Sequence, residues 1–257
     1  MKRFLIILQF FTTIHVPVDV EFTAEDFGRG IIYIPFIGAI IGFFLLGIHY
    51  LSSLLSSDTV SAVFTVIGGV IITGGLHLDG LADTFDGIFS YRPKEKMLEI
   101  MKDPRLGTFG GMALFFLLLL KIVFLLSISK ILLGKAIFVM PLFGRLGMIW
   151  CAGISEYARG KSGMGSATID FAGFREIVIC TGITILIAFL AMGSSMIVPL
   201  ATTIVFTLIF TKFIYSKIGG TTGDILGACT EISEILLLFT ILVMEKLSLI
   251  TFMQSLF

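Results

Sequence analysis

Three aspartates, Asp79, Asp83 and Asp86, follow a long apolar run with the spacing i, i+4 and i+7. Successive residues of an α-helix turn by about 100°, so these carboxylates fall within about 60° of one helix face. Like charges stacked in this way repel one another unless a cation lies between them. Hard divalent ions such as Mg²⁺ prefer oxygen ligands and usually accompany phosphate substrates. The spacing therefore predicts a Mg²⁺ site for a phosphate-containing substrate, and the other interpretation is a solvated acidic face.

A charged stretch follows these aspartates within the polar segment 77–108. Residues 93–102 predict a short helix whose apolar stripe lies on the membrane surface, with charges on its other faces. Lys102, Asp103 and Arg105 come at its end, close to several glycines. We expect a loop that returns a fourth carboxylate and two cations to the aspartates, and the other interpretation is a charged connector.

A second polar segment, 155–175, contains a glycine-rich basic run over residues 159–165. The run lacks the spacing of a Walker A loop and no strand is expected before it, so that motif is excluded. A flexible basic loop over an anionic substrate is one prediction, with Arg159 as its first cation. A plain connector is equally open.

The third polar segment, 216–234, places Asp224 and Glu231 seven residues apart, with small residues between them. On a helix these carboxylates share one face, and the small side chains allow close packing there. Asp224 is therefore a further candidate metal ligand, although it or Thr222 would also serve as a helix N-cap. Glu231 and Glu234 enter an apolar run, where an unpaired charge is costly.

Two cations, Lys121 and Arg145, lie inside apolar runs. A charged residue within a membrane span is a functional candidate unless a buried partner explains it. Arg145 stands between small residues, and a guanidinium binds phosphate groups bidentately, so we expect a phosphate contact there. Lys121 is expected only to pair with a buried carboxylate.

The elements that position these residues are strongly apolar. Of the 257 residues, 56% are hydrophobic and 14% are charged, and the mean hydropathy is +1.05. A soluble domain is normally about 25% charged, so the composition predicts a polytopic integral membrane protein. We expect an all-α helical bundle that forms one transmembrane catalytic domain over residues 1–257. The apolar run over residues 4–11 is too short to span and predicts an interfacial or re-entrant helix.

About seven transmembrane helices are expected, together with short interfacial helices. The spans are predicted at residues 30–53, 59–76, 109–130, 135–154, 176–194, 196–215 and 232–251. The net charge is zero, so no global field points to nucleic acid as a partner. The cysteines Cys151, Cys180 and Cys229 show neither disulfide nor zinc spacing and predict buried, inert thiols.

Basic residues gather at the N-terminus and in the three polar segments, and the opposite connections carry few of them. The positive-inside rule then predicts a multi-pass protein of the cytoplasmic (inner or plasma) membrane with its candidate active site facing the cytoplasm. The three segments near 77–108, 155–175 and 216–234 would share that face. A transporter would more typically show polar groups near the midplane and two similar halves, so this class is less favoured.

Taken together, these motifs give a chain that resembles the cobalamin synthase family over nearly its whole length. Residues 74–87 (Gly-Gly-Leu-His-Leu-Asp-Gly-Leu-Ala-Asp-Thr-Phe-Asp-Gly) are similar to the family signature, and residues 101–110 (Met-Lys-Asp-Pro-Arg-Leu-Gly-Thr-Phe-Gly) to its second block. Gly144-Arg145, Ala158-Arg159 and Gly223-Asp224 fit later blocks in the same order. Phe85 and Pro104 depart from the usual family residues, but neither departure removes a carboxylate.

The resemblance implies the last assembly step of the vitamin B12 nucleotide loop. A hydroxyl of α-ribazole or of its 5′-phosphate would attack the cobinamide-linked phosphorus of adenosylcobinamide-GDP, and GMP would leave. The resemblance also implies Mg²⁺ as cofactor, a corrinoid nucleotide and α-ribazole as small-molecule partners, and membrane lipid around the helices. A homo-oligomer and contacts with other enzymes of the corrinoid pathway remain open.

The expected roles in this transfer of a substituted phosphate group divide between carboxylates and cations. The metal ligands are expected among Asp79, Asp83, Asp86, Asp103 and Asp224. The general base on the acceptor hydroxyl is expected to be one of these, with Asp86 and Asp103 the leading candidates. The diphosphate would be held by Lys102, Arg105, Arg145 and Arg159.

Two other enzyme classes also place aspartates on membrane helices. A CDP-alcohol phosphotransferase is the nearer one, but the chain lacks the small-residue Ala-Arg pair that stands between that family's aspartates. A prenyltransferase would use two aspartate clusters for a prenyl diphosphate. Release of GMP, CMP or pyrophosphate separates the three enzymes, and flux across sealed vesicles without turnover would indicate a transporter.

Overall fold

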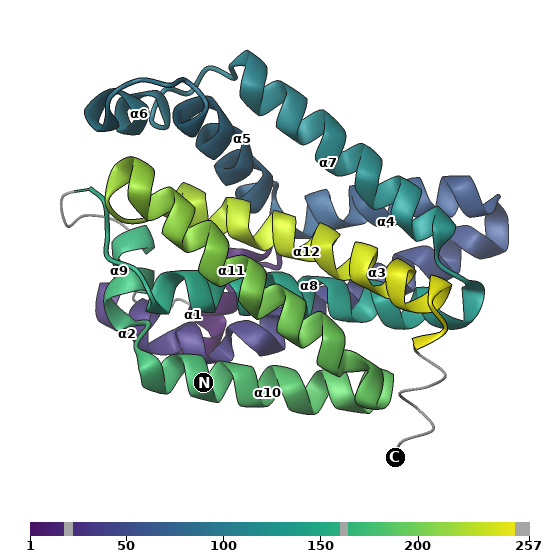
Figure 1. Ribbon diagram of the computed structural model, residues 1–257. Coiled ribbons are helices and arrows are strands. Elements are labelled where there is room, and N and C mark those ends of the chain that lie inside the picture. Colours follow the sequence, from purple (N-terminus) through teal and green to yellow (C-terminus); the bar gives the residue numbers. More distant parts are fainter. Residues whose placement is uncertain (18–22, 160–163, 250–257) are drawn as a thin grey trace.

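The computed structural model describes residues 1–17, 23–159 and 164–249, and its regular elements are helices (Figure 1). In chain order they are α1 (Lys2–Phe11), α2 (Ala24–Gly30), the 3₁₀ turn η1 (Ile31–Tyr33), α3 (Ile34–Leu55), α4 (Asp58–Thr73), α5 (Leu76–Ile88), α6 (Lys94–Ile100), α7 (Thr108–Ser127), α8 (Lys130–Gly153), α9 (Met164–Phe171), α10 (Phe174–Met192), the 3₁₀ turn η2 (Gly193–Met196), α11 (Ile197–Ile218) and α12 (Gly223–Lys246). The expected all-α class is confirmed.

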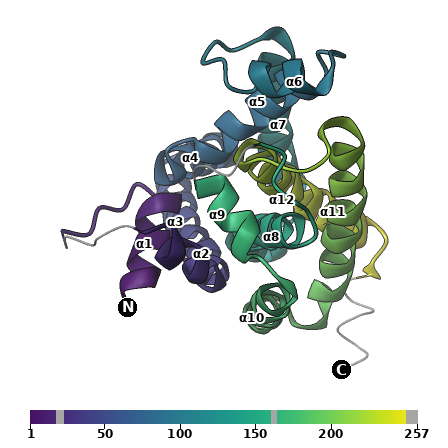
Figure 2. The same cartoon turned by 90° about the vertical axis from the view of Figure 1, so that its left-hand side faces the viewer.

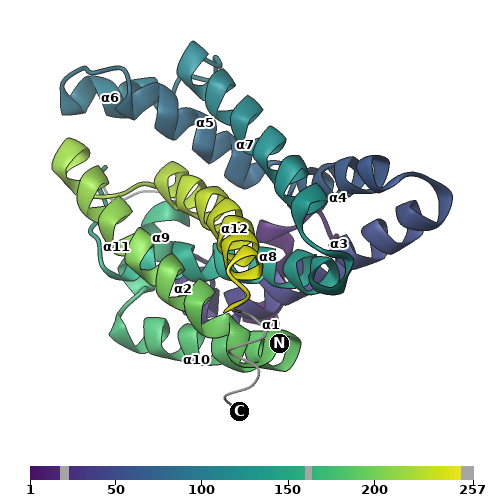
Figure 3. The ribbon, with the colours of Figure 1, turned by 45° about the vertical axis from the view of Figure 1, so that its right-hand side comes forward.

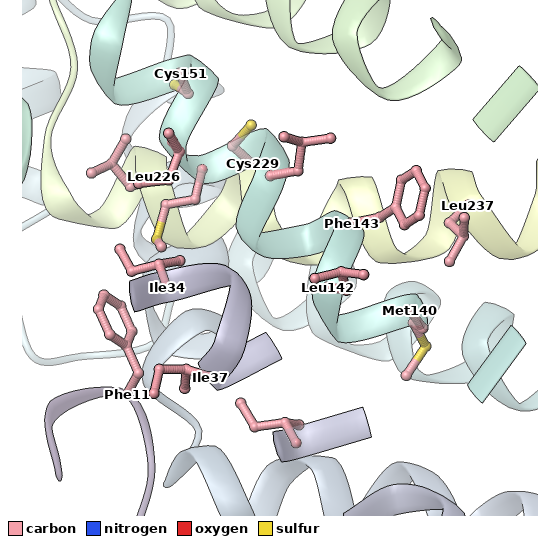
Figure 4. Close-up of a cluster of buried hydrophobic side chains, with 14 of the residues drawn as sticks. Phe11, Ile34, Ile37, Met140, Leu142, Phe143, Cys151, Leu226, Cys229 and Leu237 are labelled. Atoms are coloured by element: carbon pink, nitrogen blue, oxygen red, sulfur yellow. The ribbon is translucent and has the colours of Figure 1, made fainter. Parts of the chain in front are cut away.

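Helix α8 lies at the centre of the bundle, where α3, α9, α10, α11 and α12 contact it (Figure 2). Close approach to α3 depends on small residues, because a Cβ on Gly42 would lie 2.1 Å from the carbonyl oxygen of Phe138. Side chains from α3, α8 and α12 interdigitate along this centre, among them Ile37, Leu142 and Leu237 (Figure 4). Burial of these apolar side chains on all sides explains why α8 carries so few polar groups.

Helix α5 leaves the bundle direction at a sharp bend after α4. Gly74 and Gly75 both adopt left-handed backbone conformations, with φ of 61° and 71°, which end α4 and turn the chain by 91°. The helix that carries the aspartates therefore runs in a different direction from the apolar helix before it. Two successive glycines allow the turn, and α5 then packs across α12 and α7 (Figure 3).

Five helical segments of the described chain are long and apolar enough to cross a membrane, or up to six if the bent pair of α4 and α5 is one span. The multi-pass membrane class is thereby supported, but the count of seven is not confirmed. The difference arises at two places. Residues 174–218 form one apolar helical segment of 45 residues where two spans were expected, and α4, with 16 residues, is long enough only together with α5. Figure 1 shows α10 and α11 as two rods that meet at η2.

Several smaller expectations are confirmed. The apolar run near the N-terminus forms the ten-residue helix α1, and the charged stretch after Pro93 forms the short helix α6. Cys151, Cys180 and Cys229 are buried free thiols. Residues 160–163 of the expected basic loop lie outside the described residues.

Candidate active site

The carboxylate-bearing helices α5 and α12 cross at two glycines. A Cβ on Gly80 would lie 2.8 Å from the carbonyl oxygen of Asp224, and one on Gly227 would lie 3.1 Å from that of His77. Neither position tolerates a side chain without moving the two backbones apart. Gly80 and Gly227 therefore bring Asp224 beside the helix that carries Asp79 and Asp83.

Arg159 reaches this crossing through a backbone bridge that the sequence did not reveal. Tyr157 pairs in parallel with Thr221, and the amide of Ala158 donates to the carbonyl of Thr221 over 2.8 Å. This pairing holds Arg159 against the start of α12, where its Nη2 lies 2.9 Å from Oδ2 of Asp224. The second and third polar segments thus meet at one ion pair.

The carboxylates form one acidic face, which we call the carboxylate face: Asp79, Asp83, Asp86 and Asp224. Asp83 is half-buried, and its charged neighbours are the other three carboxylates together with the opposing cation Arg159. Neither Asp79 nor Asp83 has a hydrogen bond or an ion pair with another described residue. Because these carboxylates repel one another and Arg159 is their one cationic neighbour among the described residues, this face is suited to bind a positively charged group.

Asp86 has partners that fix its orientation. Its Oδ2 accepts from the amide of Gly107 over 2.7 Å, and its Oδ1 accepts from the amide of Gly110 over 2.9 Å. These amides belong to the first turn of α7, so Asp86 caps that helix from a neighbouring one. The contact also brings the end of the loop between α6 and α7 to the carboxylate face.

Asp103 and Arg105 lie on that loop as a bidentate pair. The guanidinium donates from Nε over 2.9 Å and from Nη2 over 2.6 Å to the two carboxylate oxygens. The hydrogen bonds from Arg105 hold the pKa of Asp103 at about 2, below its ordinary value of 3.8. Lys102 is exposed, without an ion pair to any described residue. Both cations of the loop therefore face solvent near Gly107.

Arg145 is not brought to the carboxylate face. Its side chain is 1% exposed, and its Nη1 donates to Glu234 over 2.6 Å. Glu234 also accepts from Lys121 over 2.6 Å, and Lys121 bonds Glu231 at the same distance. We call these four residues the buried ion network. The expected pairing of Lys121 with a buried carboxylate is confirmed, and Arg145 has a protein partner of the same kind.

The residues of the carboxylate face suit Mg²⁺ in chemistry, although they do not form a complete cage. Their carboxylate oxygens are the hard ligands that this ion prefers. No group of three acidic, histidine or cysteine side chains within residues 1–17, 23–159 and 164–249 is arranged to hold a metal. Mg²⁺ commonly uses only one or two carboxylates and completes its shell with water and substrate phosphate. Asp79 and Asp83, which lack other partners, fit that use.

The sequence did not single out His77 as a binding residue. The side chain is 2% exposed, stacks on Phe11 and lines a cavity beside Asp79 and Asp224. Its position one residue inside α5, at the opening of the aspartate motif, is the signal that would have indicated it. His77 is therefore a further candidate binding residue, because it shares this cavity with two residues of the carboxylate face.

Comparison with known proteins gives a consistent result over nearly the whole chain. The family model described as cobalamin-5-phosphate synthase matches residues 3–242. Adenosylcobinamide-GDP ribazoletransferase of Clostridium acetobutylicum is 40% identical over 247 residues, covering 93% of this chain and 95% of the relative. The proteins of that name from Acetivibrio thermocellus and Clostridioides difficile are 38% and 40% identical, and the matches cover 91% and 94% of this chain and 94% and 97% of each relative. No solved structure matches the chain.

Proposed function

Because the chain belongs to the cobalamin-5-phosphate synthase family, we propose that it is an adenosylcobinamide-GDP ribazoletransferase. In this reaction a hydroxyl of α-ribazole, or of its 5′-phosphate, attacks the cobinamide-linked phosphorus of adenosylcobinamide-GDP. A new phosphorus–oxygen bond forms, the bond to the GMP phosphate breaks, and the hydroxyl proton passes to a base. The products are GMP and adenosylcobalamin or its 5′-phosphate.

One observation carries the assignment of the site: the carboxylate face gathers Asp79, Asp83, Asp86 and Asp224 where α5 crosses α12, with Arg159 beside it. Transfer of a phosphorus group between oxygens places negative charge on the phosphate oxygens, and it needs cations there and a fixed acceptor. The crowded carboxylates can recruit cations to the phosphate oxygens of the substrate, and Arg159 adds a further positive charge there.

Mg²⁺ is the cofactor we propose, held by Asp79 and Asp83 and supported by Asp224. When bound it would supply positive charge to the phosphate oxygens and to the departing GMP. The support for this choice is the chemistry of the ligands and their lack of other partners. Asp103, which the sequence also offered as a ligand, is engaged with Arg105 and is not part of this set.

Asp86 is the better placed of the two sequence candidates for general base. It belongs to the carboxylate face, and the amides of α7 hold it in a fixed orientation. The low pKa of Asp103 makes that carboxylate a weak base at neutral pH. Arg159, Lys102 and Arg105 are the cations proposed for the diphosphate. We leave out Arg145, because the buried ion network engages it.

We further propose that this face is cytoplasmic in a multi-pass cell membrane. The basic residues of the polar segments and the positive-inside rule support that orientation. Water-soluble nucleotide substrates would then reach the carboxylate face directly, while lipid contacts the apolar helix surfaces.

The test is GMP release from adenosylcobinamide-GDP by the purified protein in detergent, with α-ribazole 5′-phosphate, with and without Mg²⁺. We expect release that needs acceptor, Mg²⁺ and intact aspartates, and a loss of about 10²-fold or more in kcat for Asp79→Asn and Asp83→Asn. Asp170→Asn is the matched control, because Asp170 is an exposed aspartate on α9. Near-full turnover by a folded Asp79→Asn protein would overturn the assignment, and release of CMP or pyrophosphate from the corresponding substrates would indicate the other enzyme classes.

A further inference from the structure

A cavity of about 140 Å³ lies beside the carboxylate face, between α1, α5, α8, α9 and α12. Its apolar walls include Phe10, Phe11, Met148 and Leu226, and Asp79 and Asp224 line it as well. One wall is aromatic because the rings of Phe10 and Phe11 pack edge to face, 4.9 Å apart. The cavity therefore combines an apolar interior with two residues of the proposed reaction site.

His77 gives this cavity a polar group without a partner. The side chain is 2% exposed, and its ring stacks on Phe11 with centroids 5.7 Å apart and planes 28° apart. The buried atom Nε2 has no hydrogen-bond partner among residues 1–17, 23–159 and 164–249. A buried polar atom left unpaired costs about 1–3 kcal/mol, so such atoms are rare in folded proteins unless something else pairs with them. An unpaired atom on a side chain that lines a cavity points to a bound group with a hydrogen-bonding partner for it.

We propose, on the basis of the function proposed above, that this cavity binds the aromatic nitrogen heterocycle of the α-ribazole acceptor. α-Ribazole is a nucleoside of a benzimidazole, which has an apolar bicyclic ring and one ring nitrogen that accepts a hydrogen bond. His77 Nε2 donates to that nitrogen, and the ring packs against Phe10, Phe11 and Met148. Cavities of about 150 Å³ lined by apolar side chains take up single aromatic rings, so the size fits the inner part of such a base.

The placement also orders the rest of the acceptor. Asp79 and Asp224 line the same cavity, so a base held inside it directs its ribose toward the carboxylate face. The attacking hydroxyl would then lie near the carboxylates.

The experiment compares wild type with His77→Phe, which keeps a ring stacked on Phe11 and removes the donor. The Kd for α-ribazole 5′-phosphate is measured by equilibrium dialysis without the second substrate. We expect this Kd and the KM for the acceptor both to rise about tenfold in His77→Phe. The KM for adenosylcobinamide-GDP should stay within about twofold. An acceptor whose base is indole, which lacks the accepting nitrogen, should bind wild type and His77→Phe equally. His49→Phe on α3 is the matched control and should leave both constants unchanged.

A rise in the KM for adenosylcobinamide-GDP instead of the acceptor would place guanine in the cavity and overturn the proposal. Equal affinity of wild type and His77→Phe for the benzimidazole acceptor would overturn it too. If His77→Phe does not fold, Phe10→Leu at the half-buried aromatic wall tests the same claim, with a severalfold rise in the acceptor Kd expected and no change contradicting it. Failure of the proposed function is distinguishable, because wild type would then release no GMP with any acceptor, whatever it binds.

Discussion

Replacement of Lys121 by methionine tests how the buried ion network stabilises the fold. Methionine is close to lysine in length and flexibility, so the substitution removes the charge and keeps most of the packing. Lys121 is 7% exposed and lies 2.6 Å from both Glu231 and Glu234. Glu234 retains Arg145 as a partner in the variant, but Glu231 is left without a cation.

The expected cost follows from that single uncompensated charge. Removal of one partner from a buried ion pair typically costs about 3–5 kcal/mol, since the remaining charge stays out of water. For a chain of this size, each 1 kcal/mol lowers Tm by about 2–4 °C, so we expect Tm to fall by about 6–20 °C. The double variant Lys121→Met/Glu231→Gln removes the orphaned charge and should recover at least half of the loss.

The assay is thermal unfolding in detergent, followed by the intrinsic fluorescence of Trp150 or by differential scanning calorimetry. Lys212→Met is the matched control, because Lys212 is an exposed lysine of the membrane helix α11. Its Tm should stay within about 2 °C of wild type. A Lys121→Met protein as stable as this control, or a double variant no more stable than the single one, would refute the reasoning.

Three further predictions concern the carboxylate face and its loop. Asp86→Asn should cost about 1–3 kcal/mol by weakening the cap of α7, seen as a lower Tm with Mg²⁺ absent; an unchanged Tm would contradict the capping role. Gly80→Ala should lower kcat at least tenfold by pushing Asp224 from α5, whereas Gly182→Ala, in open space on α10, should leave activity and fold intact; equal activities would contradict the close crossing. The pKa of Asp103 is lowered to about 2, so its contact with Arg105 should persist above about pH 4 and be lost as the pH falls through about 2. Limited proteolysis measures this contact, and cleavage of the loop that already sets in near neutral pH would contradict the prediction.

Much of the carboxylate face could be predicted from spacing alone. The i, i+4 and i+7 pattern of Asp79, Asp83 and Asp86 fixes their common helix face without knowledge of any neighbour. Asp224 could be expected near them because small residues surround it and Gly80, which favours a close helix crossing. Both features depend on the spacing of residues within one helix, so they can be predicted from the sequence.

The rest depended on geometry that no local pattern contains. The bend of 91° between α4 and α5 follows from two glycines, yet isolated glycines in membrane helices often cause no bend. The place of Arg145 depends on how α8 is rotated in the bundle, and that rotation is set by contacts with α3 and α12. Arg159 reached Asp224 through a bridge between Tyr157 and Thr221, residues that carry no chemical signal of their own.

Helix α12 contributes residues both to the carboxylate face and to the buried ion network, and these residues lie on one face of the helix. Asp224 and Glu231 are seven residues apart, so a single face runs from the carboxylate face to the buried ion network. Any rotation of α12 that moved Asp224 from Gly80 would also draw Glu231 from Lys121, at the cost of an unpaired charge in the bundle. The buried ion network therefore holds Asp224 in its place against α5, and its energetic role extends to the geometry of the site.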